Sequence, residues 1–262
     1  MENYKITADS TVRLPVGLHL DGEVIYEVTI DEWRFIDSAK LSSEKAKRSG
    51  TQAQMDVIAR LIQTVGGFTK TSHKSMCPDR YVKKMHSADA SVIIATALAL
   101  AGQELQECEY VCTKCGTEAV EELSLLELEV VPHDPELPPY VEFELPRGVD
   151  ASGPSGEGKG KRGHYHFPTL FHEKLTEKAA AKGPLYKLNG LLVHCVRDFD
   201  YSDRLSSDMV DDIGLEDQNY LMEVLAEGMP GLETAVKSDC PECMAENILN
   251  FDLAKYFLSR KK

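Results

Sequence analysis

The sequence lacks the excess of positive charge that nucleic-acid-binding proteins use. Its 262 residues contain 29 Lys and Arg against 43 Asp and Glu, which gives a formal net charge of −14 at pH 7. Both halves of the chain are acidic, so neither half has the basic balance that a phosphate backbone attracts. We therefore expect no nucleic acid among the partners of this protein.

A long hydrophobic run and a signal peptide are also missing. The most apolar stretch, residues 90–102, is much shorter than the roughly 20 residues that a helix needs to cross a bilayer. Residues 1–20 do not show a charged segment followed by an apolar one. We expect a soluble protein of a reducing compartment with no membrane partner. Its length suits one large domain or two of about 130 residues.

Cysteines are few, and their number is odd. Four of the seven form two Cys-x-x-Cys pairs: Cys112 with Cys115, and Cys240 with Cys243. In a reducing compartment, two such pairs indicate a metal site rather than disulfides. The other three are expected to be small buried side chains: Cys77, Cys108 and Cys195.

Together, the two pairs predict one structural zinc ion, because zinc takes four ligands in a tetrahedron and each Cys-x-x-Cys turn supplies two thiolates. A set of four cysteines leaves no open coordination position, so the site is predicted to be structural and not catalytic. A thioredoxin-like redox role is the alternative for a Cys-x-x-Cys pair, although that motif is expected once, at the start of a helix.

No catalytic set can be assembled from local spacing, and we expect no enzyme. His164 and His166 share a face of a predicted strand and could form a metal pair. Lys159, Lys161 and Arg162 precede them, in a patch that is either a solvated hairpin tip or a contact for phosphate or an acidic partner. Residues 153–160 have the glycine and lysine spacing of a P-loop, but glycine replaces the final Ser or Thr that would hold Mg²⁺.

Similar motifs recur in the same order in the two halves of the chain. An LP-x-G motif opens a β-like segment at residues 14–17 and again at 145–148. Each Cys-x-x-Cys pair is followed after seven residues by an apolar, polar, apolar triplet, at 123–125 and at 251–253. We therefore predict a diverged tandem duplication with about 130 residues per copy.

The predicted fold class is α+β, with a β-hairpin, helices, a cysteine knuckle and a closing strand in each of two pseudo-symmetric copies. The first copy, residues 1–131, has a hairpin over 11–30 that turns at Asp21 and Gly22. Its helices are predicted over 52–66, ending at Gly66, and over 87–102, with Ser87 or Asp89 as N-cap and Gly102 as the stop. An amphipathic strand with a solvated acidic face is predicted over 121–130.

The second copy, residues 132–262, is predicted to repeat this plan. Its helices are expected over 184–196 and 215–228, and Asp217 occupies the place of Asp89. The hairpin of this copy carries an insertion at 149–163 whose Gly, Ser and Lys content is typical of a flexible loop tip. Residues 132–139, with four prolines, form the predicted junction between the copies.

This combination of motifs resembles a known protein family. The LP-x-G openings, the segments YVCTKCG and LLVHCV, and the closing CPEC with NFDLAKYFL are similar to the zinc-binding tail or baseplate hub assembly proteins of contractile-tailed bacteriophages. The resemblance implies zinc at the four paired cysteines and tail or hub proteins as partners. It also implies a place in the virion baseplate or, during assembly, in the host cytoplasm.

Two main classes of function thus remain after the sequence has been considered, beside the thiol oxidoreductase that a Cys-x-x-Cys pair allows. The first is a zinc-stabilised structural component or assembly chaperone of a phage baseplate hub, acting through protein contacts. The second is a zinc-ribbon regulator that binds nucleic acid, which would have to do so in spite of the acidic composition. The pattern does not specify an oligomeric state.

Overall fold

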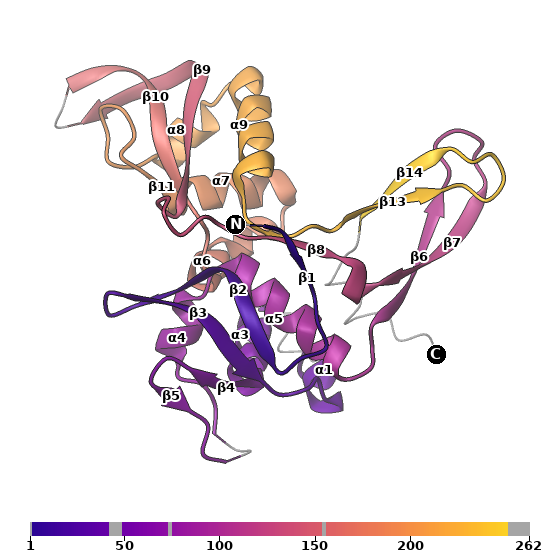
Figure 1. Ribbon diagram of the computed structural model, residues 1–262. Helices are drawn as coiled ribbons and strands as arrows, with labels where there is room; N and C mark the ends of the chain where they lie inside the picture. Colours follow the sequence, from indigo (N-terminus) through magenta and orange to yellow (C-terminus); the bar gives the residue numbers. More distant parts are fainter. Residues whose placement is uncertain (1, 42–48, 73–74, 154–155, 251–262) are drawn as a thin grey trace. The chain divides into compact units, whose positions relative to one another are not determined.

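The computed structural model describes residues 2–41, 49–72, 75–153 and 156–250 (Figure 1). The chain divides into two compact units: unit 1 contains Met1–Pro132 and Pro230–Lys262, and unit 2 contains His133–Met229. The division between Pro132 and His133 falls at the first residue of the predicted proline-rich junction, and residues 133–139 belong to unit 2. However, the predicted second copy is divided between them, because the segment that begins at Pro230 packs with unit 1.

A four-stranded antiparallel sheet in the order β2-β3-β4-β5 lies in unit 1. Its strands are β2 (Thr11–Leu20), β3 (Glu23–Ile30), β4 (Ile62–Val65) and β5 (Phe68–Thr69). The predicted hairpin and its turn are confirmed, because Asp21 and Gly22 have φ angles of 49° and 90°. Two positive φ angles in succession match the twist of the flanking strands.

Four described helices accompany this sheet: α1 (Phe35–Leu41), α3 (Gly50–Leu61), α4 (Asp79–Lys84) and α5 (Ser87–Leu100). Helix α5 is buried along almost its whole length, as its apolar sequence predicts. Gly102 ends it with a φ angle of 69°, in agreement with the sequence. The N-cap position belongs to His86, so neither Ser87 nor Asp89 is the N-cap that was predicted.

The helix predicted over 52–66 is wrong at its C-terminal end. Helix α3 ends at Leu61, and the chain continues directly as β4, with Ile62 and Val65 buried. Gly66, with a φ angle of 51°, lies in the turn between β4 and β5 and is not a helix cap. A short apolar run fits the burial pattern of a helix and of a strand equally well, so periodicity alone could not place this boundary.

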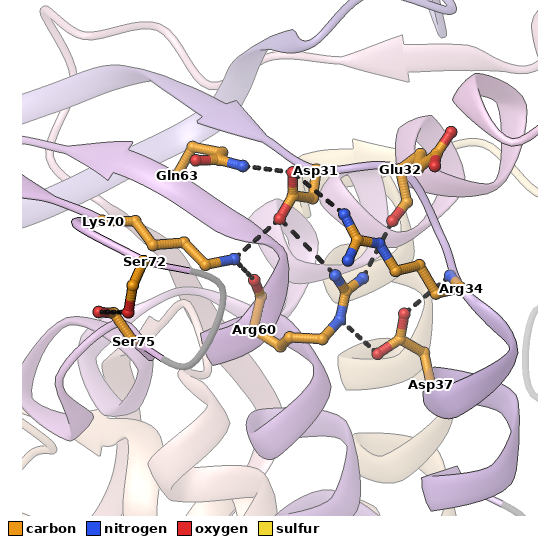
Figure 2. Close-up of polar contacts among 9 residues, drawn as sticks. All are labelled: Asp31, Glu32, Arg34, Asp37, Arg60, Gln63, Lys70, Ser72 and Ser75. Atoms are coloured by element: carbon orange, nitrogen blue, oxygen red, sulfur yellow. Dashed lines mark hydrogen bonds and ion pairs between the residues drawn. The ribbon is translucent and has the colours of Figure 1, made fainter.

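Charged side chains fix the end of α3 against the segment after β3 (Figure 2). Arg60, in the last turn of α3, donates through Nε to the buried carboxylate of Asp37 and through Nη2 to the carbonyl of Glu32 at 3.0 Å. Lys70 donates to Asp31 and to the carbonyl of Arg60, each at 2.8 Å. Removal of Arg60 would leave the buried carboxylate of Asp37 without its charged partner. Because a buried charge requires a partner, this loss would strongly destabilise the folded state.

Two smaller hairpins in unit 1 carry the cysteine motifs. The first consists of β6 (Leu105–Val111) and β7 (Glu118–Ser124), and the second of β13 (Ala235–Asp239) and β14 (Glu246–Asn250). The acidic strand predicted over 121–130 is interrupted, because Leu125–Glu127 forms a 3-10 turn before β8 (Glu129–Val131). The triplet at 251–253 lies outside the described residues.

A three-stranded sheet brings the C-terminal segment back to unit 1. Strand β8 pairs with β1 (Tyr4–Lys5) on one side and with β12 (Gly231–Leu232) on the other. All the strand pairs that the structure describes, here and elsewhere, are antiparallel, as expected for an α+β fold. Within the described ranges, no helix is long and apolar enough to traverse a bilayer.

Unit 2 packs helices against a three-stranded sheet in the order β11-β10-β9. Its strands are β9 (Tyr140–Gly153), β10 (Gly156–His166) and β11 (Val196–Arg197), and its helices are α6 (Leu170–Ala180), α7 (Pro184–Cys195), α8 (Ser207–Asp211) and α9 (Leu215–Gly228). The helices predicted over 184–196 and 215–228 correspond to α7 and α9. The core lies between the sheet and α7, α8 and α9.

The insertion at 149–163 is not the loop tip that its composition suggests. Its described residues, 149–153 and 156–163, lie in β9 and β10, and Val149 and Ala151 are buried. A Cβ atom at Gly158 would lie 2.9 Å from the ring of Tyr201, and one at Gly160 would lie 2.4 Å from the ring of Phe199. These glycines therefore make room for two aromatic rings, and the composition was misread as a sign of flexibility.

One contact occurs in the same form in both units, between an LP-x-G segment and the first turn of a helix. Asp89 is the third residue of α5, and its Oδ1 accepts the backbone N–H of Val16 at 2.8 Å and that of Gly17 at 3.4 Å. Asp217 is the third residue of α9, and its Oδ1 accepts the N–H of Arg147 at 2.8 Å. Both carboxyl groups are buried.

Candidate metal centre

Each Cys-x-x-Cys pair occupies the turn of a two-stranded hairpin, and the two turns have the same backbone hydrogen bonds. Cys112 donates its N–H to the carbonyl of Thr117 at 2.9 Å and accepts the N–H of Gly116 at 3.0 Å. In the second turn, the N–H of Cys240 reaches the carbonyl of Ala245 at 2.9 Å, and the N–H of the residue after Cys243 reaches the carbonyl of Cys240, also at 2.9 Å. The backbones of the two knuckles are therefore equivalent.

The residue after each pair needs a positive φ angle. Gly116 has a φ angle of 76°, which glycine adopts without cost. Met244 takes the same place in the second knuckle, with a φ angle of 54° and a largely exposed side chain. The second knuckle therefore holds a side chain at a φ angle that normally favours glycine.

The four sulfur atoms converge within unit 1, all lying within 4.8 Å of one another. The Sγ atoms of Cys112 and Cys243 are 3.7 Å apart, and those of Cys115 and Cys240 are 3.6 Å apart. A disulfide would require about 2.05 Å. Four sulfurs on a tetrahedron around an ion with metal–sulfur bonds of about 2.3 Å lie about 3.8 Å apart, which matches the close pairs.

The cluster is partly shielded from water. Cys112 and Cys240, the first cysteine of each knuckle, are buried, whereas Cys243 is half-buried and Cys115 is exposed. Each knuckle thus contributes one inner and one outer sulfur. Because four protein ligands would complete a tetrahedron, the arrangement can hold a metal ion but leaves no position for a substrate.

The knuckle amides favour the thiolate form of the first pair. Backbone N–H groups of Cys115 and Lys114 point at the sulfur of Cys112 and lower its pKa to about 6. The side chain and the backbone of Thr117 lower the pKa of Cys115. For Cys243, the N–H of Ala245 also favours the thiolate, but burial and the neighbouring sulfurs outweigh it and raise its pKa to about 12.

Asn247 connects the two hairpins beside the sulfurs, a role that was not predicted from the sequence. Its Oδ1 accepts the N–H of Thr113 at 3.1 Å, and its Nδ2 donates to the carbonyl of Ala245 at 2.8 Å and lies 3.8 Å from the sulfur of Cys112. The side chain is buried. A polar residue on the buried face of a predicted strand is the signal that could have pointed to it.

The remaining cysteines are separate from the cluster. Cys77 and Cys195 are buried, as predicted, and burial raises the pKa of each thiol to about 12. Cys108 is only half-buried, in β6. Among the residues that the structure describes, the four clustered cysteines are the only group of three or more metal-ligating side chains close enough to share an ion.

The histidine and lysine candidates of unit 2 have partners on their own hairpin or the neighbouring loop. His164 stacks on Tyr140, with ring centroids 4.3 Å apart, and its Nδ1 lies 3.2 Å from Asp198. Lys159 forms an ion pair with Asp150 at 3.0 Å, and Lys161 donates to the carbonyl of Pro146 at 2.7 Å. In the P-loop-like stretch, the described residues 153 and 156–160 lie in β-strands. This part of the stretch therefore has no helix N-terminus that could bind phosphate.

Comparison with known proteins identifies no relative. No family model matches the chain, and neither does any curated protein or solved structure.

Proposed function

We propose that the four clustered cysteines bind a single zinc ion that clasps the two hairpins together. The observation that supports this most directly is the convergence of Cys112, Cys115, Cys240 and Cys243, with all sulfurs within 4.8 Å. Tetrahedral sites made only of thiolates hold zinc or iron. Zinc is the choice for a purely structural role, because it has no redox chemistry and no preferred geometry that the protein must strain to meet.

A shared zinc ion would stabilise two hairpins that are weak on their own. A single two-stranded hairpin is at best marginally stable in water, and each knuckle hairpin has only two strands. Binding free energies of structural zinc in small domains are about 10–16 kcal/mol, and part of this is folding free energy. A shared ion would therefore stabilise both hairpins and would fix the C-terminal segment of unit 1 to its N-terminal part.

Metal analysis tests the clasp. Purified protein should contain one zinc and no iron per chain by inductively coupled plasma mass spectrometry. Changing any of the four cysteines to serine should lower the zinc content and the melting temperature together. Cys195→Ala, in the core of unit 2, should leave the zinc content at one. A protein that keeps its melting temperature in strong chelator, with no metal bound, would contradict the proposal.

The chain is further proposed to be a diverged tandem duplication. In support of it, the two knuckles share their hydrogen bonds, and Asp89 and Asp217 make the same contact with the two LP-x-G segments. Helices α3 and α7 each have 12 residues and continue directly into a strand. In this proposal, the second knuckle belongs by descent to the second copy and packs with the first.

At the level of biology, the proposed role is that of a baseplate hub assembly protein of a contractile phage tail. The resemblance of the LP-x-G and cysteine motifs supports this role, and a metal-clasped acidic protein is suited to hold a partner in a defined orientation. The alternative of a nucleic-acid-binding regulator is disfavoured by the exposed face of the first knuckle hairpin, where Glu107, Glu109, Glu118 and Glu122 lie.

Phage genetics tests this role. Disruption of the gene in a phage that encodes the protein should give defective tails, and wild-type protein supplied in trans should restore them. Quantitative mass spectrometry of particles and lysate then separates the two forms of the proposal. A fixed copy number per particle indicates a structural component, and presence in the lysate alone indicates a chaperone. Normal tails without the gene would overturn both forms.

A further inference from the structure

The first knuckle hairpin has two very different faces. On one side lie Cys108, Tyr110, Ala119, Glu121 and Leu123, which are buried or half-buried. This side and the knuckle turn meet the second hairpin: the hydroxyl of Ser238 donates to Glu121 at 3.1 Å, and Asn247 accepts the N–H of Thr113. Figure 1 shows the two hairpins side by side. The other side is exposed, and we call it the outer face. It consists of Leu105, Glu107, Glu109, Val111, Glu118, Val120 and Glu122.

The outer face concentrates negative charge. In the strand register, Glu107 lies directly opposite Glu122, and Glu109 is a diagonal neighbour of both Glu118 and Glu122. Like charges directly opposite each other on a sheet destabilise it. Within the described parts of the chain, Glu109, Glu118 and Glu122 have no ion pair, and Lys114, in the knuckle turn, is the hairpin's one basic residue. A partner with positive charge would relieve the repulsion among Glu109, Glu118 and Glu122.

Apolar side chains on the outer face add a second feature. Leu105 is 52% exposed, and Val111 and Val120 are each 60% exposed. Val120 lies opposite Glu109, and Val111 lies opposite Glu118, so valine and glutamate alternate across the strands. A simple solvated face has little reason to expose three large apolar side chains among its glutamates, whereas a contact surface combines apolar area with charges that select the partner.

We propose that the outer face is a docking surface for a segment of a partner protein that alternates basic and apolar side chains. Carboxylates on one face of a strand repeat about every 6.8 Å, which is also the repeat of alternate side chains in an extended peptide. Such a segment can therefore place lysine or arginine beside the glutamates and apolar groups beside the valines. The inference rests on one part of the proposed function, namely that the protein acts through contacts with another protein.

The test uses peptides of defined chemistry and the full chain loaded with zinc. The probe is a blocked nonapeptide in which lysine alternates with valine and leucine, and pentalysine carries the same charge without apolar groups. Binding is measured by isothermal titration calorimetry at low salt. We expect saturable binding of the alternating peptide, stronger than that of pentalysine. The face variant should bind the alternating peptide about tenfold or more weakly than the wild type does. In this variant four glutamates are changed to Gln: Glu107, Glu109, Glu118 and Glu122.

A matched control changes the same amount of charge elsewhere. Asp211→Asn, Asp212→Asn, Glu223→Gln and Glu227→Gln together alter four exposed acidic residues of unit 2 and should leave the peptide affinity within about twofold. The double variant Val111→Ser, Val120→Ser should weaken the binding of the alternating peptide and leave the binding of pentalysine unchanged. Equal weakening by the face variant and the control, or no saturable binding, would overturn the proposal.

Two further readouts separate this inference from others. If the wild type dimerises in sedimentation experiments and the face variant does not, the face belongs to a second copy of the chain and the proposal is wrong. Zinc content and the circular dichroism spectrum, measured on each variant, test the clasp independently. If the protein binds zinc and supports tail assembly but does not bind the peptide, the docking surface is rejected and the proposed function is not.

Discussion

The carboxylate of Asp89 accepts the backbone N–H of Val16 at 2.8 Å, across 73 residues of sequence. Val16 belongs to the LP-x-G segment of β2, and Asp89 lies in the first turn of α5. Asp217 and Arg147 make the same contact in unit 2, also at 2.8 Å. In each unit, one buried carboxylate oxygen thus fixes the helix to the bend in the strand, and the other has no hydrogen-bond partner in the described structure.

This relationship predicts that replacing either aspartate lowers the stability of the protein by a similar amount. Replacing Asp89 with alanine removes the acceptor of a buried backbone N–H, and replacing Asp217 with alanine removes the acceptor of a part-buried one, which costs about 1–3 kcal/mol. Chemical denaturation followed by circular dichroism should show this loss for each variant. Asp9→Ala, at an exposed position, serves as control and should change the free energy of unfolding by no more than about 0.5 kcal/mol. A neutral Asp89→Ala would show that the contact does not stabilise unit 1.

The titration of Asp89 predicts a pH dependence with a definite sign. Burial raises its pKa to about 7, although the N–H groups of Val16 and Gly17 act in the opposite direction. In the unfolded chain the pKa is about 3.9. Between these values the folded state binds more protons, so the contribution of Asp89 to stability is highest below pH 4 and falls as the pH rises to about 7.

Asp89→Asn should therefore remove this slope. The free energy of unfolding, measured by denaturant titration at several pH values from 4.5 to 7.5, should decrease with pH more steeply in the wild type than in the variant. Taking the difference between the two proteins cancels the pH dependence that they share, including any release of metal. Parallel curves would mean that Asp89 is ionised throughout this range.

The parts of the fold that the sequence predicted are those set by local chemistry. Asp21 and Gly22 form a turn because of their own backbone preferences, and α5 and α9 follow apolar patterns long enough to be unambiguous. The pairing of the cysteine motifs followed from the number of ligands that a tetrahedral metal needs. None of these predictions required knowledge of distant neighbours.

The features that were missed depend on residues far away in the chain. The glycines of β10 indicated a flexible loop, but they are required by the rings of Phe199 and Tyr201, which pack against them. Asp89 resembled an N-cap, yet its partner is a strand segment distant in sequence. The place of the second knuckle in unit 1 follows from pairing of β12 with β8, which no local pattern shows.

The two knuckles predict that glycine is the more stable residue at both equivalent positions, which are occupied by Gly116 and Met244. Met244 has a φ angle of 54°, which costs a side chain about 1–2 kcal/mol relative to glycine. Met244→Gly should raise the stability of the zinc-loaded protein by about 0.5–1 kcal/mol, because part of the gain is lost to the greater freedom of glycine in the unfolded chain.

Gly116→Ala is the matched change and should lower stability by about 1 kcal/mol. A Cβ atom at Gly116 would meet no other atom within 4 Å, so only the φ angle of 76° opposes it. Thermal denaturation of both variants at a fixed zinc concentration measures the pair. Changes of the same sign in the two variants would contradict the equivalence of the knuckles.

Asn247 predicts how the second hairpin supports the metal ligands. Groups that hydrogen-bond to metal-binding side chains typically change metal affinity by about 10–100-fold when they are removed. Asn247→Ala removes the acceptor of the Thr113 N–H and the donor to the sulfur of Cys112, so zinc should be lost to a competing chelator at about tenfold lower chelator concentration. Asn247→Asp keeps an acceptor for Thr113 but places a carboxylate beside the thiolates, and it should weaken zinc binding at least as much.

Ser238→Ala serves as the control. It breaks a contact between the hairpins away from the cysteines and should lower the melting temperature with little effect on the chelator titration. If Asn247→Ala and Ser238→Ala behaved alike in that titration, Asn247 would be a packing residue and not a support of the metal ligands.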